Sequence, residues 1–446
     1  MSIISFLTKK FKLSSKKEKV AKNVYWAILG KSLNLISGIF VGILVARFLG
    51  PEKYGLMNYV ITYVSLFSIL SNFGLDNIEI RELAKEEEKR NVIIGSTLVV
   101  RLLLSLLTIL IIFITLVIFE SDRQTIFLIL LYSCSLMFNS FNVVRNYFTS
   151  IVMNEYVIKT EIVRTFFSAI LKISLLFLKA KLFYFILILT FDFALLAAGY
   201  TYSYRKKIGD IKQWQFDINI AKQLLKYSFP LLFSGSAIIM YQKVDQILIR
   251  NMMDNVSLGY FSVAVRLTEV TLFIPMIISQ TIGPLLVKLR QEKPEEYLKK
   301  RQSFVTLLFW VSLSITIGMI LCSKMLVLML YGQEYEPAIS VLKVLAIKIT
   351  FLGIFNCSTQ LIIIENLQKY AVIRNLMGLV VSLALNFLLI PHFGIMGAAI
   401  ATVAANVFSS YIAHGIIKPF RFIFLLQNNA ILQIKRLPMI ISNLKK

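Results

Sequence analysis

The sequence predicts an all-α, polytopic integral membrane protein that crosses a bilayer about twelve times. Of its 446 residues, 57% are hydrophobic and only 16% are charged, whereas a soluble domain carries about 25% charged residues. Residues 92–119 contain Arg101 as their single charge, and residues 125–144 contain none. A helix of about 20 apolar residues covers the ~30 Å hydrocarbon core of a bilayer, so each stretch predicts a membrane span.

Hydropathy divides the whole chain into twelve such predicted spans, and the loops between them hold most of the charged residues. The first span follows a basic segment and is too long for the apolar region of a cleaved signal peptide, so we expect it to be retained. The predicted spans are residues 24–46, 56–75, 92–119, 125–145, 162–178, 182–204, 227–249, 258–283, 302–322, 338–364, 371–390 and 395–417.

The distribution of basic residues predicts the orientation of these spans. An even number of spans places both termini on one side of the membrane. The segments on that side carry 34 Lys and Arg residues, and the loops on the other side carry 8. Because cytoplasmic loops retain positive charge during insertion, the asymmetry predicts cytoplasmic termini and a multi-pass protein of the cell inner (cytoplasmic) membrane. The same pattern explains the net charge of +24 without nucleic acid as a partner.

Two halves of the chain resemble each other. A span ends at Arg47 and Gly55 opens the next helix, and the same order recurs at Arg250 and Gly259, 203 and 204 residues later. This spacing favours a parallel repeat of six spans, although chance similarity between apolar helices would also explain it. The predicted domains are a basic N-terminal segment (1–23), a six-helix bundle (24–204), an amphipathic cytoplasmic linker (205–226), a second six-helix bundle (227–417) and a basic tail (418–446).

The sequence offers no catalytic, cofactor-binding or metal-binding motif. Residues 30–32 read Gly-Lys-Ser, but Tyr25 stands where a phosphate-binding loop needs its first glycine, and no strand is predicted before it. His392 and His414 are the only histidines, too few for a zinc cluster or a convincing Ser-His-Asp triad. The longest predicted external loop, residues 323–337, is short for a membrane-embedded polymerase. We therefore expect a protein that is not an enzyme.

Charged residues inside the predicted spans are the candidate functional residues, because a charge at the bilayer centre costs about 2.5–3.5 kcal/mol on insertion scales. Their positive excess predicts a cationic cavity that attracts an anion such as a pyrophosphate. Snorkelling to the interface is the alternative for each basic residue. The predicted substrate-binding residues are Lys31, Arg101, Arg266, Lys172, Lys243 and Lys348, and the acidic residues at the same depth are Asp192, Asp245 and Glu269.

The acidic residues allow two interpretations. Arg266 and Glu269 are three residues apart on one helical face, so they could neutralise each other. Alternatively, Asp245 or Glu269 could bind a coupling proton or cation, as intramembrane carboxylates do in many transporters. The sequence leaves both possibilities open.

Four stretches resemble the bacterial polysaccharide flippases, which transport O-antigen and capsule repeat units. In order, they are residues 47–55 (RFLGPEKYG), 228–232 (SFPLL), 331–335 (YGQEY) and 390–402 (IPHFGIMGAAIAT). The resemblance implies membership of the multidrug, oligosaccharidyl-lipid and polysaccharide exporter superfamily and a MATE-like fold, with two six-helix bundles around a cavity. It also implies a cationic lumen, which Lys31, Arg101 and Arg266 would supply by their helix positions.

The function that the resemblance implies is translocation of undecaprenyl-pyrophosphate-linked oligosaccharide repeat units from the inner to the outer leaflet. Its partners would be this lipid-linked oligosaccharide, the membrane lipids and a polysaccharide polymerase with its chain-length machinery. Two alternatives remain at this stage. One is a cation-coupled small-molecule or multidrug exporter of the same superfamily, which the basic bias disfavours, and the other is a membrane-embedded glycosyl polymerase or ligase.

Overall fold

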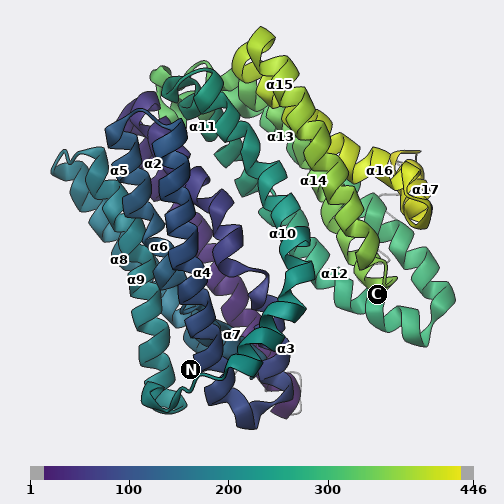
Figure 1. Ribbon diagram of the computed structural model, residues 1–446. Helices are drawn as coiled ribbons and strands as arrows, with labels where there is room; N and C mark the ends of the chain where they lie inside the picture. The colour runs from purple at the N-terminus through teal and green to yellow at the C-terminus, as the bar shows by residue number, and fades with distance from the viewer. Residues whose placement is uncertain (1–14, 433–446) are drawn as a thin grey trace, which may run out of the picture. The chain divides into compact units, whose positions relative to one another are not determined.

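The computed structural model in Figure 1 describes residues 15–432. Side chains are described for Trp26, Gly30 and residues from 33 onward, except for residues 35, 233, 234 and 238. All regular elements within residues 15–432 are helices, which confirms the predicted all-α class. The described chain forms two compact units, one made of the residues up to Phe48 with Val60–Gly235, the other made of Leu49–Tyr59 with the residues from Ser236 onward.

The first unit is built mainly from the N-terminal half of the chain. It comprises most of α2 (Ser15–Asn72), then α3 (Leu75–Lys85), η1 (Glu87–Lys89), α4 (Arg90–Phe119), α5 (Arg123–Ser133), α6 (Ser135–Asn139), α7 (Asn142–Ser150), α8 (Asn154–Phe177), α9 (Leu182–Lys207), η2 (Ile211–Gln213) and the start of α10 (Ile218–Met252).

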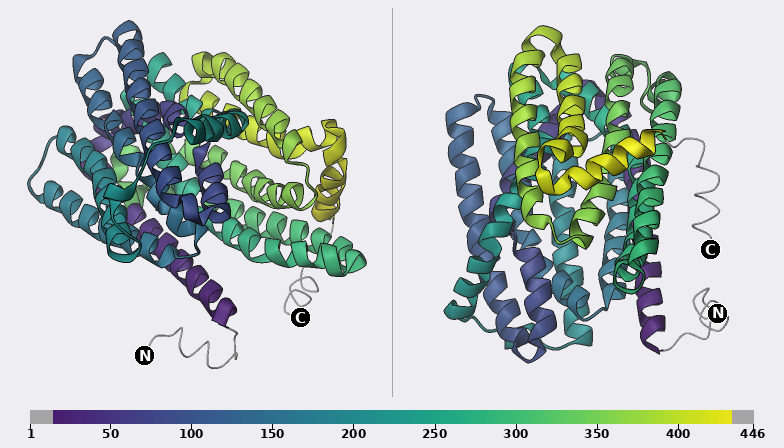
Figure 2. Two further views of the ribbon diagram at one scale, coloured as in Figure 1. Left: turned by 60° about the horizontal axis from the view of Figure 1, so that its bottom comes forward. Right: turned by 90° about the vertical axis from the view of Figure 1, so that its right-hand side faces the viewer.

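The second unit contains residues 49–59 of α2, the rest of α10 and all later described elements. These are α11 (Asn255–Thr271), α12 (Phe273–Glu292), α13 (Pro294–Tyr331), η3 (Gln333–Tyr335), α14 (Ala338–Ile364), α15 (Gln368–Val407), η4 (Phe408–Ile412), α16 (Ala413–Ile416), η5 (Lys418–Phe420) and α17 (Arg421–Leu432). The right-hand view of Figure 2 shows α17, in yellow, at a steep angle to the other helices of its unit.

Eight helices within residues 15–432 are long and apolar enough to cross a membrane, or nine if the bent helix α10 counts as one span. The protein is therefore a multi-pass membrane protein. The predicted number of twelve is not confirmed, and two features explain the difference. Helices α2 and α15 each contain two of the predicted spans, and α8 carries Glu161, Arg164 and Lys172 within its apolar stretch.

The two long helices bend where a glycine adopts a conformation that other residues avoid. Gly50 has φ 70° and ψ 171°, and Pro51 follows it. Gly394 has φ 56° and ψ −138°, three residues after Pro391. Glycine reaches positive φ without a steric penalty, and proline removes a backbone donor, so each pair separates two predicted spans without an unwound loop.

The packing of both units is that of a protein in lipid. Several large apolar side chains at helix surfaces are exposed, including Phe119, Phe177 and Leu321, and a bilayer would cover them. The first unit buries a core around Val144, Tyr147 and Phe148 of α7. The second buries a core in which Phe304 of α13, Leu361 of α14 and Ile423 of α17 meet. The basic tail predicted from residue 418 therefore begins with a helix that packs into this core.

The predicted linker, residues 205–226, contacts the rest of the first unit through a backbone hydrogen bond and a pair of aromatic rings. The Gln215 amide donates to the Asn91 carbonyl over 3.2 Å, and the Trp214 ring lies 5.3 Å from the Tyr204 ring. The predicted external loop 323–337 needs correction, since α13 continues to Tyr331 and leaves only residues 332–337 between helices. The apolar character of Met325 to Met329 sustains the helix beyond the predicted boundary. The predicted domain boundaries stay predictions.

The glycines at the repeated positions 55 and 259 lie against each other inside the second unit. A Cβ atom on Gly55 would overlap the backbone carbonyl of Asn255, and one on Gly259 would overlap the backbone of Pro51. Backbone atoms held in two helices cannot rotate away as a side chain can. The close approach of α2 and α11 therefore requires glycine at both positions.

We predict that Gly259→Ala lowers stability by about 1–3 kcal/mol, because the added methyl group forces the two backbones apart. The thermal midpoint of the detergent-purified protein, followed by tryptophan fluorescence, measures the effect. Gly318→Ala in α13 is the matched control, since a Cβ there meets no atom within 4 Å, and its midpoint should be unchanged or slightly higher. Equal midpoints for the two variants would contradict the prediction.

Candidate functional site

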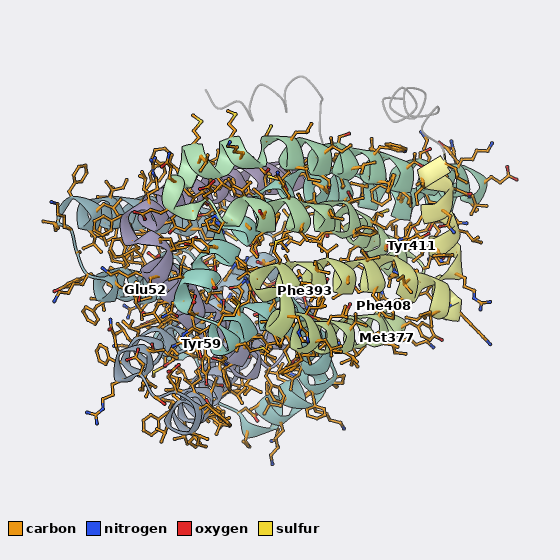
Figure 3. All side chains as sticks on the ribbon, turned by 90° about the horizontal axis from the view of Figure 1, so that it is seen from above. Glu52, Tyr59, Met377, Phe393, Phe408 and Tyr411 are labelled. Atoms are coloured by element: carbon orange, nitrogen blue, oxygen red, sulfur yellow. The ribbon has the colours of Figure 1, made fainter. Side chains whose placement is uncertain are left out.

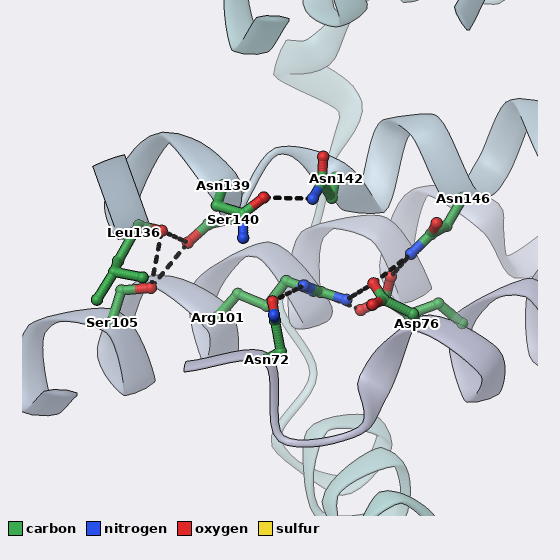
Figure 4. A network of polar contacts seen from close by, with 10 residues as sticks. Asn72, Asp76, Arg101, Ser105, Leu136, Asn139, Ser140, Asn142 and Asn146 are labelled. Carbon is green, nitrogen blue, oxygen red and sulfur yellow. Dashed lines mark hydrogen bonds and ion pairs between the residues drawn. The ribbon is translucent and has the colours of Figure 1, made fainter. Parts of the chain in front are cut away.

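The first unit encloses one of the predicted basic residues in a polar network (Figure 4). Arg101 of α4 donates from Nε to Glu79 Oε1 over 2.6 Å and from Nη2 to Asp76 Oδ1 over 2.6 Å. Its Nη1 donates to Asn72 Oδ1 over 3.2 Å. The Asn146 amide of α7 donates to Glu79 Oε2 over 2.6 Å and to Asp76 Oδ1 over 3.0 Å. Four helices, α2, α3, α4 and α7, therefore meet at one guanidinium group.

The predicted role of Arg101 as a cavity residue needs correction. Its side chain is 1% exposed, and two carboxylates surround its charge. Glu79 and Asp76 lie three residues apart in α3, which gives them one helical face toward Arg101. The sequence placed both carboxylates in a loop and so missed the pairing. Arg101 holds the first unit together and does not present a free charge to a substrate.

Lys172 is neutralised in the same unit. Its Nζ donates to Asp192 Oδ2 of α9 over 3.0 Å and to Ser168 Oγ over 2.7 Å. Ser168 also donates to Asp192 Oδ2 over 2.8 Å. Helices α8 and α9 are thus joined by a paired charge, which is a weaker candidate for binding an anion. The side chain of Lys31 lies outside the residues that the structure describes.

The remaining predicted residues come together in the second unit, on α10, α11 and α14. Lys243 Nζ lies 3.7 Å from Glu269 Oε1. Asp245, 3% exposed, accepts a hydrogen bond of 2.9 Å from Thr402 Oγ1 of α15 and one of 2.8 Å from the Gln246 amide. Lys348 is 6% exposed and lies within electrostatic range of Asp245, Glu269 and Lys243. Residues up to 105 positions apart in sequence form this charged cluster.

Arg266 lies beside the cluster without a carboxylate of its own. The structure places Glu269 on Lys243, and not on Arg266 as one interpretation of the sequence allowed. The guanidinium instead interacts electrostatically with the hydroxyl groups of Tyr54 and Tyr331. It forms no ion pair with any residue whose side chain the structure describes. Arg266 is thus a basic residue without a direct carboxylate partner among the described side chains.

Arg374 of α15 is a candidate that the sequence analysis missed. Its side chain is 2% exposed, and its guanidinium carbon lies 4.1 Å from the centre of the Phe355 ring. Its Nε donates to Asn375 Oδ1 over 3.4 Å, and its Nη1 has no hydrogen-bond partner among the described residues. Arg374 falls inside the predicted span 371–390, but it is not among the predicted substrate-binding residues.

A polar stripe at a spacing of four residues could have revealed this position. Arg374, Gly378, Ser382 and Asn386 recur on one face of α15 and are all buried. Because α15 bends at Gly394, the later part of the chain returns along this face, and a Cβ on Gly378 would lie 3.0 Å from Ser409 Cβ. Figure 3 labels the neighbouring Met377 and Phe408, which pack on the core of the second unit.

The balance of charge differs between the two units. In the first unit, Arg101 and Lys172 lie against Asp76, Glu79 and Asp192. The second unit holds four basic residues in its helices, Lys243, Arg266, Lys348 and Arg374, and two acidic ones, Asp245 and Glu269, which lie with Lys243 and Lys348. The positive excess therefore belongs to the second unit. Within residues 15–432, no three His, Cys, Asp or Glu residues come together as a metal site.

Comparison with known proteins finds a matching protein family and a related capsular protein. Residues 20–290 match the protein family described as "Polysaccharide biosynthesis protein". The capsular polysaccharide biosynthesis protein CapF of Staphylococcus aureus is 27% identical over 253 residues, which are 56% of this chain and 60% of CapF. The chain therefore covers less than two thirds of this relative.

Solved structures share the fold over nearly the whole chain. The lipid II flippase MurJ in an inward closed conformation superposes with a TM-score of 0.71 at 15% identity, covering 92% of this chain and 91% of MurJ. An inward-facing multidrug resistance MATE family transporter of the MOP superfamily gives 0.67 at 14% identity, covering 90% and 96%. The predicted MATE-like fold class is confirmed.

We predict that Arg101→Gln destabilises the protein by about 3–5 kcal/mol, because it leaves the fully buried Glu79 without its charged partner. The yield of folded protein and its thermal midpoint should both fall. Adding Glu79→Gln to the same chain should recover part of the loss, since the unpaired buried charge is then removed. A double variant no more stable than Arg101→Gln alone would contradict this account of the network.

Proposed function

Because this chain belongs to the polysaccharide biosynthesis protein family, we propose that it is a flippase for lipid-linked oligosaccharides. Its cargo would be an undecaprenyl-pyrophosphate-linked repeat unit, carried from the inner to the outer leaflet of the cytoplasmic membrane for a surface polysaccharide such as capsule or O-antigen. The movement would follow alternating access through a cationic cavity, without a chemical reaction on the cargo. A polymerase with its chain-length machinery would consume the product.

The positive excess of the second unit is the observation that carries this proposal. Arg266 has no carboxylate partner among the described residues, and Arg374 has an unpartnered Nη1 atom. An arginine guanidinium offers several donors in a planar fork that fits phosphate oxygens, so such groups favour a pyrophosphate over a neutral or cationic cargo. Lys348 lies within electrostatic range of Asp245 and Glu269.

A cation-coupled exporter of small molecules is the second candidate, and one observation favours it. Asp245 is almost fully buried and is held by Thr402 and by a backbone amide. Intramembrane carboxylates of this kind bind protons or cations in many transporters. The two functions are compatible at this residue, because a flippase could use Asp245 or Glu269 for its coupling ion.

Leaflet-specific labelling of the lipid-linked repeat units tests the proposed function. Cells lacking the protein should accumulate repeat units that react only from the cytoplasmic side of inverted membrane vesicles. Restoring the chain should return the units to the outer leaflet and surface polysaccharide to the cell. Normal surface polysaccharide in a clean deletion would contradict the flippase proposal, and altered drug tolerance in its place would favour the exporter.

We predict that Arg266→Ala reduces transport by about tenfold or more, because a charge-assisted contact to the cargo phosphate is lost. Arg266→Lys should retain much of the activity, since it keeps the charge. Lys31→Ala and Lys348→Ala should also impair transport at near-normal membrane levels. Surface polysaccharide and the leaflet assay measure the effect in a deletion strain carrying each variant.

Lys288→Ala is the matched control for these variants, because Lys288 lies on the surface and forms an ion pair with Glu292 four positions later. It should complement the deletion fully. If all the alanine variants at positions 31, 172, 243, 266 and 348 also complemented fully, the cationic site would be excluded, whereas the fold assignment would be unaffected.

A further inference from the structure

A pocket of about 600 Å³ lies in the first unit between α8 and α9, apart from the charged cluster of the second unit. The two helices are antiparallel neighbours (Figure 1), so the start of α8 and the end of α9 lie at the same end of the pair. One face of each helix lines the pocket. On α8 the lining positions run from Tyr156 to Phe167, and on α9 they run from Leu195 to Lys207.

One end of the pocket is basic and aromatic. Lys206 and Lys207 end α9, Lys159 lies at the same end on α8, and Arg164 lies further along the groove, next to Val163. Lys206 Nζ lies 5.6 Å from the centre of the Tyr202 ring, and Lys207 Nζ lies 5.6 Å from that of Tyr156. These rings keep both ammonium groups at the mouth of the pocket.

The positive charge of this end is only partly compensated. Lys159 pairs with Glu155 over 2.6 Å, but no carboxylate lines the pocket. Arg164 Nε is buried and has no hydrogen-bond partner among the described residues. A buried donor without a partner has lost its hydrogen bonds to water and made none within the protein. An anion at this position would accept a hydrogen bond from it.

Beyond Lys159 the lining of the pocket is mostly apolar and faces outward, with Arg164 as the one basic residue along it. Val163 and Phe167 of α8 and Leu195 of α9 line it, and Val163 is 69% exposed. A soluble anion would not need this surface, whereas an acyl chain would cover it. Along the groove, basic residues come first and apolar residues follow. A membrane lipid has the same order, with a charged phosphate at one end and an acyl chain at the other.

We propose that this groove binds an anionic glycerophospholipid of the bilayer. Its phosphate would lie among Arg164, Lys206 and Lys207, and one acyl chain would lie along Val163 and Phe167. Basic pockets between membrane helices recognise anionic headgroups through the same combination of charge and depth. The basic ends of α8 and α9 fall in segments predicted to be cytoplasmic, where anionic lipids act on the protein.

Lipid binding to the purified full-length protein tests the proposal, with phosphatidylglycerol, phosphatidylcholine and inorganic phosphate as the three probes. Native mass spectrometry in detergent would report the fraction of protein that retains each probe. We expect phosphatidylglycerol to be retained in preference to phosphatidylcholine, and inorganic phosphate not to compete. Phosphate competing as well as the lipid, or equal retention of both lipids, would overturn the proposal.

Two variants locate the site. Lys206→Gln with Lys207→Gln should weaken phosphatidylglycerol binding by about tenfold or more, since each basic residue near an anionic headgroup contributes several-fold. Ser203→Trp should weaken it by filling the groove without changing its charge. The matched control is Lys299→Gln with Lys300→Gln, an adjacent lysine pair near the start of α13.

The outcomes separate this proposal from the flippase function. Loss of binding in the α9 variants, with binding retained in the α13 control, supports the lipid site whether or not transport occurs. Equal binding by all variants, or equal loss in both lysine pairs, would exclude a specific site in this groove. Each variant must elute as a single species with a thermal midpoint near that of the parent protein. If either α9 variant does not, Lys206→Gln alone replaces it.

Discussion

A charge inside a bilayer must find a partner within the protein, and this constraint organises both units. Water cannot solvate Arg101 at its 1% exposure, so Glu79, Asp76 and Asn72 surround it and Asn146 fixes the carboxylates. Four helices are held at that point because their side chains are needed there together. Removing any member would leave a buried group that no solvent can reach, so the network specifies one arrangement of the first unit.

The same constraint holds in the second unit, but among its described residues not every charged group is fully partnered. Lys243 and Asp245 have partners in Glu269 and Thr402, but the buried Arg374 keeps an Nη1 donor that the described residues do not satisfy. An unsatisfied buried donor lowers the stability of the fold. Such donors are concentrated at sites where a bound ligand can accept their hydrogen bonds. The contrast between the fully paired Arg101 of the first unit and the incompletely partnered Arg374 of the second is the reason why we propose a cargo site in the second unit.

Backbone geometry sets the limits within which these charges can be arranged. Gly50 and Gly394 allow two long helices to bend without exposing unpaired peptide groups to lipid. Gly55 and Gly259 bring α2 and α11 close enough that no side chain fits between them. In the groove between α8 and α9, Gly199 and Thr160 both line the pocket and lie in close contact. Small residues thus decide where helices touch and where they leave room.

The sequence by itself determined the all-α membrane class and the family, because hydrophobic length and local motifs are properties of contiguous residues. It also found most of the charged positions at membrane depth. Only the tertiary structure decided which of them are neutralised, since the partners of Arg101 lie 22 and 25 positions away and Thr402 lies 157 positions from Asp245. Pairing depends on which helix faces meet, and hydropathy carries no information about that. For the same reason Arg374 was missed, and the sequence could not separate the structural arginine from the candidate ones.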